Sequence, residues 1–208
     1  MRPFYKVIGK KYIKRSKSYR RMVNFKLLQK EVKEYDSLRE EVIKKSRDVL
    51  KLSKLIIYAV HRDELDKAAK LVKEIEQELK KLDTIAAKKD KLKFEGSYKV
   101  AVQEYVEALL YYYFVKEGTI KDLKVDPAYF VAGLGDLPGE LNRRAVFLAG
   151  KGKVDEVIAI RNVVDEIYGE LLEFDLRDNE LRKKVDAVKY ELRKLEDLVL
   201  DLNLKGRT

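Results

Sequence analysis

The chain contains no cysteine, one histidine and three prolines among its 208 residues. The absence of cysteine excludes disulfide bonds, thiolate metal sites and cysteine nucleophiles. The single histidine, His61, excludes any site that needs two imidazoles from one chain, such as a His-x-x-x-His zinc motif. No apolar stretch approaches the roughly 18 residues of a membrane span, and the basic N-terminus lacks the apolar core of a signal peptide. We therefore expect a soluble protein that resides in the cytoplasm.

The scarcity of proline and the absence of strand patterns predict a helical protein. Proline occurs only at positions 3, 127 and 138, and no stretch alternates like a β-strand bounded by turn residues. The sequence predicts an all-α, single-domain antiparallel helical bundle of about six to seven helices over residues 25–208. The first three expected helices cover about 25–60, 65–82 and 97–115. A fourth runs from about 127 to a turn at 150–152, a fifth from there to about 174, and a last over 178–204.

The formal net charge of +10 is concentrated at the N-terminus. Residues 1–24 contain nine lysines and arginines and no acid, which leaves 37 basic and 36 acidic residues in the rest of the chain. We predict that residues 1–24 form a basic tail. It is either an arm that contacts RNA phosphates or a solvated extension, or else untranslated sequence if Met22 is the true start.

The third predicted helix, over 97–115, carries an unusual pair of acids. Its only charged residues are Lys99, Glu104 and Glu107, and the two glutamates lie one turn apart on the same face. Two like charges repel, and burial raises that cost unless the carboxylates share a cation. An exposed acidic strip is the alternative, although the neighbouring residues Ala101 and Ala108 are apolar.

The fourth predicted helix repeats this arrangement. Asp136 and Glu140 are four residues apart and share a face, and Arg143 falls on the same side. In one interpretation Asp136 caps a helix N-terminus and Glu140 pairs with Arg143. In the other, the two acidic pairs provide the oxygen ligands of a Mg²⁺ or Mn²⁺ site, with one ion or two.

The last predicted helix has the strongest periodicity of the chain. Its apolar residues repeat in a strict 4-3 pattern, which predicts a narrow seam for a partner helix in the same chain or in another subunit. The seam residues are Leu181, Val185, Val188, Leu192, Leu195, Val199 and Leu202. We expect the chain to be oligomeric through this helix.

Three segments resemble the translin family, and most closely its translin-associated factor X branch. They are QEYVEA (103–108), GLGDLPGELNR (133–143) and the C-terminal segment 181–206, within a similarity that runs from about residue 35 to residue 206. The resemblance implies an all-α bundle that assembles into octameric barrels with RNA inside. It also implies a Mg²⁺-dependent endoribonuclease whose metal-binding acids correspond to Glu104, Glu107, Asp136 and Glu140.

We therefore predict a Mg²⁺- or Mn²⁺-dependent endoribonuclease that cleaves single-stranded or loosely paired RNA inside a homo-octamer. With no histidine in the two acidic pairs, a carboxylate or hydroxide has to act as the base. Non-catalytic binding of RNA or single-stranded DNA is the alternative, and a helical scaffold without a nucleic-acid role is a third possibility. The expected RNA contacts are Lys93, Lys99, Arg143 and Arg144, which flank or share the helices that carry the acids.

Overall fold

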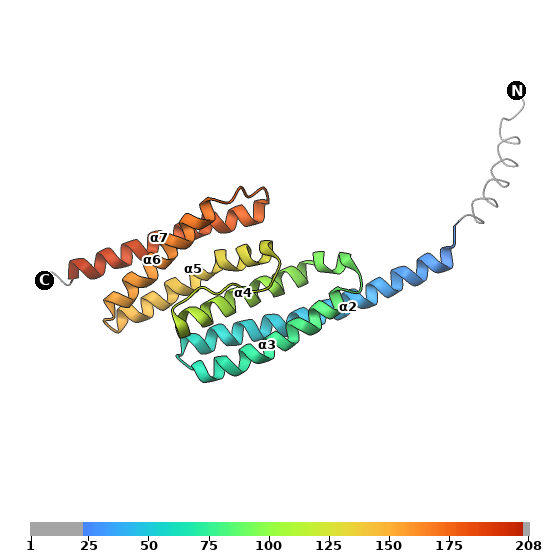
Figure 1. Ribbon diagram of the computed structural model, residues 1–208, viewed down its shortest axis with the longest axis horizontal. Coiled ribbons are helices and arrows are strands. Elements are labelled where there is room, and N and C mark those ends of the chain that lie inside the picture. The colour runs from blue at the N-terminus through green and yellow to red at the C-terminus, as the bar shows by residue number, and fades with distance from the viewer. Residues whose placement is uncertain (1–22, 206–208) are drawn as a thin grey trace, which may run out of the picture. The chain divides into compact units, whose positions relative to one another are not determined.

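The computed structural model describes residues 23–205, which form six α-helices and one short 3-10 helix without any β-strand (Figure 1). No helix in this range is both long enough and apolar enough to cross a membrane. The all-α prediction and the order of the helices are confirmed. The elements are α2 (Phe25–His61), α3 (Leu65–Ala86), η1 (Asp90–Phe94), α4 (Gly96–Glu117), α5 (Pro127–Gly150), α6 (Val154–Leu172) and α7 (Asn179–Lys205).

The chain divides into two compact units, residues 1–41 and residues 42–208, and α2 crosses the boundary between them. In the first unit, the described part is the beginning of α2, where Phe25, Leu27 and Val32 are exposed. Almost all of the predicted basic tail lies outside the described residues, so its role stays a prediction. The start of the domain at residue 25 stays a prediction too. All the acids and basic residues singled out above, apart from those of the tail, lie in the second unit.

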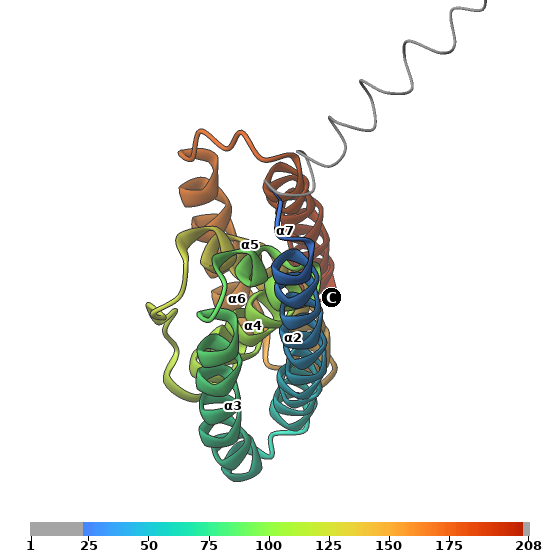
Figure 2. The same cartoon turned by 90° about the vertical axis from the view of Figure 1, so that its right-hand side faces the viewer.

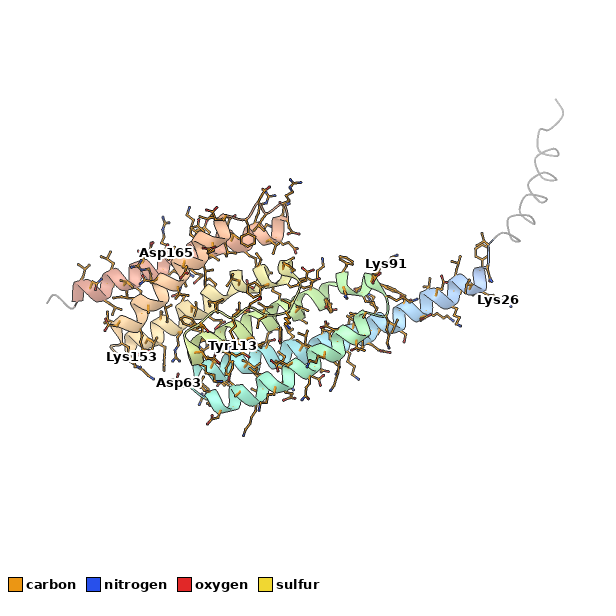
Figure 3. The ribbon with its side chains drawn as sticks, in the orientation of Figure 1. Lys26, Asp63, Lys91, Tyr113, Lys153 and Asp165 are labelled. Atoms are coloured by element: carbon orange, nitrogen blue, oxygen red, sulfur yellow. The ribbon has the colours of Figure 1, made fainter. Side chains whose placement is uncertain are left out.

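Helix α5 is the central element of the second unit. It packs against α4, α6 and α7, while α3 packs against α4 (Figure 2). The core includes Leu109 and Leu110 of α4 together with Leu137 and Leu141 of α5, all of them at most 1% exposed. Burying each such side chain stabilises a fold by about 1.5–3 kcal/mol. Charged side chains such as that of Lys153 project outward (Figure 3).

Helices α4 and α5 run in the same direction, because the segment 118–126 carries the chain back along the bundle (Figure 1). Gly118 ends α4 in the left-handed conformation with φ +71°. Asp126 then caps α5, accepting a hydrogen bond from the backbone N of Ala128 at 2.9 Å, with Pro127 in the first turn. Since α5 continues unbroken through Asp136, the interpretation of that residue as a helix N-cap is wrong.

The seam of α7 is buried inside the chain. Val188 and Leu195 are fully covered, and α7 packs against α5 and α6. Of the two predicted alternatives, a partner helix in the same chain or in another subunit, the structure shows the first, because the seam packs against α5 and α6. The expectation that the chain is oligomeric through α7 stays a prediction, which falls on the side of the helix away from the covered seam. The seam is already covered, whereas Tyr190, Leu200 and Leu204 of α7 are exposed.

Candidate functional site

Two glycines of α5 allow its neighbours to approach closely beside Asp136. A Cβ atom at Gly133 would lie 2.6 Å from Cβ of Val106 on α4, which is too close for any residue larger than glycine. A Cβ atom at Gly135 would lie 3.1 Å from Cβ of Lys184 on α7. The sequence Gly-Leu-Gly-Asp therefore brings α4 and α7 toward the same acidic residue from two sides.

Asp136 is held by one residue from each of these neighbouring helices. The Lys184 ammonium lies 2.7 Å from Oδ1 and 2.6 Å from Oδ2 of Asp136. The Gln103 amide donates a second hydrogen bond to Oδ2 at 2.5 Å. Only 28% of the Asp136 side chain and 27% of the Lys184 side chain are exposed. A lysine thus provides a positive charge beside the acids, and Lys184 was not among the predicted site residues.

Glu140 is held by the only histidine of the chain. Nε2 of His61, the last residue of α2, is hydrogen-bonded to Oε2 of Glu140. The other ring nitrogen, Nδ1, lies 2.9 Å from the hydroxyl of Tyr111 on α4. Neither acidic pair contains a histidine in the sequence, but the fold brings His61 to Glu140 from a distant part of the chain. The expectation that a carboxylate or hydroxide acts as the base stays a prediction.

The two glutamates of α4 face the same half-buried space as the acids of α5. Burial raises the pKa of Glu107 to about 8, and the charges of Asp136, Glu104 and Glu140 add to that rise. Burial also raises the pKa of Glu104, against the opposing effect of Lys54. All four predicted acids lie close enough to one another to interact electrostatically. The alternative of a solvated acidic strip does not fit this burial.

The four acids fit a divalent cation by their chemistry. They are hard oxygen donors, and burial followed by the neighbouring acids raises the pKa of Glu107, so a cation here would offset the cost of ionising it. Within residues 23–205, however, no three histidine or acidic side chains are gathered into a ligand set. Asp136 is instead oriented toward Lys184, and Glu140 toward His61.

The four predicted RNA contacts lie on both sides of these acids along α4 and α5. Lys93 and Lys99 are exposed near the start of α4, with the Lys99 ammonium 5.9 Å from the Phe94 ring centroid. Arg144 lies beyond the acids, is only 13% exposed and pairs with Asp63 at 2.5 Å. Arg144 is thus the least accessible of the four.

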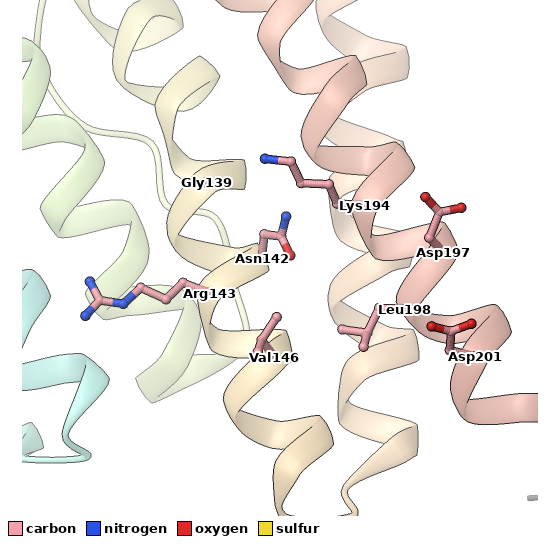
Figure 4. Close-up of a pocket in the computed structure, with 8 residues that line it drawn as sticks. All are labelled: Gly139, Asn142, Arg143, Val146, Lys194, Asp197, Leu198 and Asp201. Atoms are coloured by element: carbon pink, nitrogen blue, oxygen red, sulfur yellow. The ribbon is translucent and has the colours of Figure 1, made fainter. Parts of the chain in front are cut away.

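Arg143 lies beside a groove between α5 and α7 (Figure 4). Its exposed side chain extends away from α7, whereas Lys194 of α7 extends toward α5. Asn142, on the same turn, donates a hydrogen bond to Glu191 at 2.7 Å and so ties the two helices together. The groove is lined by Gly139, Asn142, Arg143, Val146, Lys194, Asp197, Leu198 and Asp201.

Comparison with known proteins gives matches along most of the chain. The family model described as the Translin family matches residues 37–125 and 119–206. An uncharacterized protein of Methanocaldococcus jannaschii is 31% identical over 182 residues, which cover 83% of this chain and 80% of that protein. Translin-associated protein X of Mus musculus is 25% identical over 231 aligned residues, which cover 89% and 79% of the two chains.

A solved structure described as an AfC3PO–duplex RNA complex has a similar fold. It superposes with a TM-score of 0.69 at 27% sequence identity, covering 88% of this chain and 98% of that chain.

Proposed function

Because the chain belongs to the translin family, we propose that it is a metal-dependent endoribonuclease that acts on single-stranded or loosely paired RNA. The observation that carries this proposal is the convergence of Glu104, Glu107, Asp136 and Glu140 in one half-buried space. These acids also occupy the positions that correspond to the metal-binding acids of the factor X branch. The similarity to translin-associated protein X extends over most of the chain and supports the same branch.

RNA as the ligand is supported by the similar solved structure, which is a complex with duplex RNA. Lys93, Lys99 and Arg143 are exposed on either side of the acids, where they can contact phosphates. The preference for single-stranded or loosely paired RNA comes from the family resemblance, whereas the similar complex holds a duplex.

The chemistry follows from the donor set. The four acids would hold Mg²⁺ or Mn²⁺, and the ion, when bound, would stabilise negative charge on the attacked phosphate and lower the pKa of a bound water. The chain's own contribution is to position these acids. Gln103 donates a hydrogen bond to Asp136, and Lys184 supplies a positive charge beside it that a bound cation would displace. The Arg143 guanidinium is available to bind a phosphate.

We further propose that the chain acts as a homo-oligomer, an octameric barrel in the cytoplasm that encloses RNA. The octamer and its interior site come from the family resemblance. The exposed apolar residues Tyr190, Leu200 and Leu204 of α7 are the surface that we assign to contacts between subunits. Large exposed apolar groups of this kind are typical of interfaces.

A non-catalytic RNA-binding assembly is the second candidate. The observation that favours it is that Asp136 and Glu140 are each already paired with a residue of this chain, Lys184 and His61. In that case the acids serve the fold, and RNA is retained without being cut.

The two candidates are separated by a cleavage assay. End-labelled single-stranded RNA is incubated with the full chain in Mg²⁺, in Mn²⁺ or in EDTA. We expect cleavage with either metal, none in EDTA, and none in Asp136→Asn. The matched control is Asp197→Asn, which changes an exposed aspartate of α7 and should cleave like wild type. Retention of RNA without cleavage under every metal condition would instead support the non-catalytic assembly.

A further inference from the structure

We propose that His61 is a positioning residue for Glu140 and that the hydroxyl of Tyr111 fixes the histidine in turn. The inference rests on the proposed function insofar as Glu140 is taken as a metal ligand. It goes beyond that function by assigning a role to the single histidine and to a buried tyrosine. The three residues come from the end of α2, from α4 and from α5, so the contact joins three helices at the candidate site.

The geometry uses both nitrogens of the His61 ring. Nε2 faces Oε2 of Glu140, and Nδ1 lies 2.9 Å from the Tyr111 hydroxyl. A carboxylate can only accept a hydrogen bond, so Nε2 carries the hydrogen and donates it. In the neutral ring Nδ1 then carries no hydrogen and accepts from the Tyr111 hydroxyl. Among the two neutral tautomers of the imidazole, the arrangement therefore selects Nε2–H.

Because His61 and Tyr111 are buried, these two hydrogen bonds hold the imidazole ring in one orientation. Only 9% of the His61 side chain is exposed, and Tyr111 is fully buried. Burial raises the pKa of Tyr111 above its ordinary value, which keeps the hydroxyl protonated and able to donate. The tyrosine ring also packs against the imidazole, with 4.8 Å between ring centroids and 42° between planes. Rotation of His61 would leave buried polar atoms without partners.

The turn that follows His61 is attached to α5, the helix that carries Glu140. Asp63 adopts a left-handed conformation with φ +60°. Its carboxylate pairs with Arg144 at 2.5 Å and with Lys151 at 3.6 Å, both near the end of α5. The end of α2 is therefore fixed to α5 just beyond Glu140, which holds His61 in place beside that residue.

The hydrogen bond from His61 engages Oε2 of Glu140. Because the carboxylate is thereby held in one orientation, the position of its other oxygen, Oε1, is fixed as well. Groups that hydrogen-bond to a ligating carboxylate orient it, and their loss typically lowers metal affinity by about 10–100-fold. His61 does not need to touch RNA or metal for this role. Its loss should change metal binding while the fold is retained.

Because the chain has only one histidine, labelling histidine with ¹⁵N gives imidazole signals from His61 alone. In the metal-free full chain at alkaline pH, we expect a protonated Nε2 and an unprotonated Nδ1. Tyr111→Phe removes the hydroxyl but keeps the ring, and should alter the Nδ1 signal. An Nδ1–H tautomer, or an average of both tautomers that Tyr111→Phe leaves unchanged, would overturn the proposal.

The second readout is Mn²⁺ affinity, measured by electron paramagnetic resonance on the same chain. His61→Leu should weaken binding by about 10–100-fold. His61→Gln keeps an N–H donor near the position of Nε2 and should restore most of the affinity. Affinities for all three proteins that agree within twofold would overturn the positioning role.

Failure of the proposed function is distinguishable from failure of this inference. If wild type binds no Mn²⁺ but shows the expected tautomer, the metal-dependent function is refuted while the contact of His61 with Glu140 stands. If His61→Leu does not fold, the tautomer and the Tyr111→Phe variant decide the question, since Tyr111→Phe preserves the packing of the ring.

Discussion

Glu107 carries the largest electrostatic cost in the candidate site. Burial, followed by the charges of Asp136, Glu104 and Glu140, raises its pKa to about 8 from an ordinary 4.5. Between these two values the folded chain keeps a proton that the unfolded chain releases. The free energy of unfolding therefore decreases as pH rises through this window, by at most about 1.4 kcal/mol per pH unit from this group, and levels off above it.

Replacing Glu107 by glutamine should remove this dependence. Glu107→Gln cannot ionise, so its stability relative to wild type should increase steadily from about pH 5 to pH 8 and then become constant. The measurement is the urea midpoint of both proteins across this range in EDTA. Parallel curves for the two proteins would show that Glu107 ionises freely and lies outside the half-buried space.

The ammonium group of Lys184 occupies a position beside Asp136 where, under the proposed function, a metal ion would otherwise bind. Lys184→Met removes the ammonium that contacts both oxygens of Asp136, so we expect Mn²⁺ to bind more tightly because one competing positive charge is gone. The control is Lys54→Met, which removes an exposed charge that acts on Glu104. Isothermal titration calorimetry should show the larger gain for Lys184→Met. Equal or weaker binding by that variant would contradict a competition at Asp136.

At the scale of the elements, the site depends on how closely α4 and α5 approach each other. Gly133→Ala would force Cβ into contact with Val106, and overpacking of this kind typically costs about 1–3 kcal/mol. Gly139 lies on the exposed side of the same helix with open space around it. Gly139→Ala should therefore be neutral or stabilising, by about 0.5–1 kcal/mol. Denaturant unfolding compares the two variants, and equal stabilities would contradict the close approach.

Helix α7 gives a second test at this scale. Leu195→Glu places a charge where the seam is fully covered, and an unpaired buried charge costs about 3–5 kcal/mol. We expect the variant to lose folded structure, since the seam holds the chain itself together. Leu200→Glu on the exposed face should keep the fold. A Leu195→Glu protein with the stability of wild type and a smaller mass by light scattering would instead place this seam between subunits.

The helices were largely predictable from the sequence, because each follows from local spacing. The Asp126–Pro127 start of α5 and the 4-3 pattern of α7 are examples. The acids were found for the same reason, since two pairs at helical spacing stand out on apolar helices. Gln103 lay beside Glu104 in the quoted motif, although its contact with Asp136 was not assigned.

The partners of the acids could not be predicted in this way. Lys184 is 48 residues from Asp136, and His61 is 79 residues from Glu140. No local period links residues so far apart, and their meeting depends on how the helices pack. The parallel direction of α4 and α5 departs from the predicted antiparallel arrangement. It depends likewise on the path of the segment 118–126, which carries the chain back along the bundle.

At the scale of the whole molecule, charge is distributed unevenly. The chain carries +10 in total, yet residues 25–208 hold 37 basic and 36 acidic residues. An RNA site within this nearly neutral part has to concentrate its positive charge locally. Lys93, Lys99 and Arg143 are exposed, and along α4 and α5 they lie to either side of the four acids. Basic groups therefore lie outside and carboxylates between them.

The most direct test of the central claim is anomalous diffraction from crystals of the full chain grown with Mn²⁺. The account predicts anomalous density between α4 and α5, in contact with oxygens of Glu104, Glu107, Asp136 and Glu140. Crystals of Asp136→Asn grown under the same conditions should lack it. Wild-type crystals with Mn²⁺ bound only elsewhere, and with Asp136 still paired to Lys184, would contradict the assignment of these four acids as a metal site.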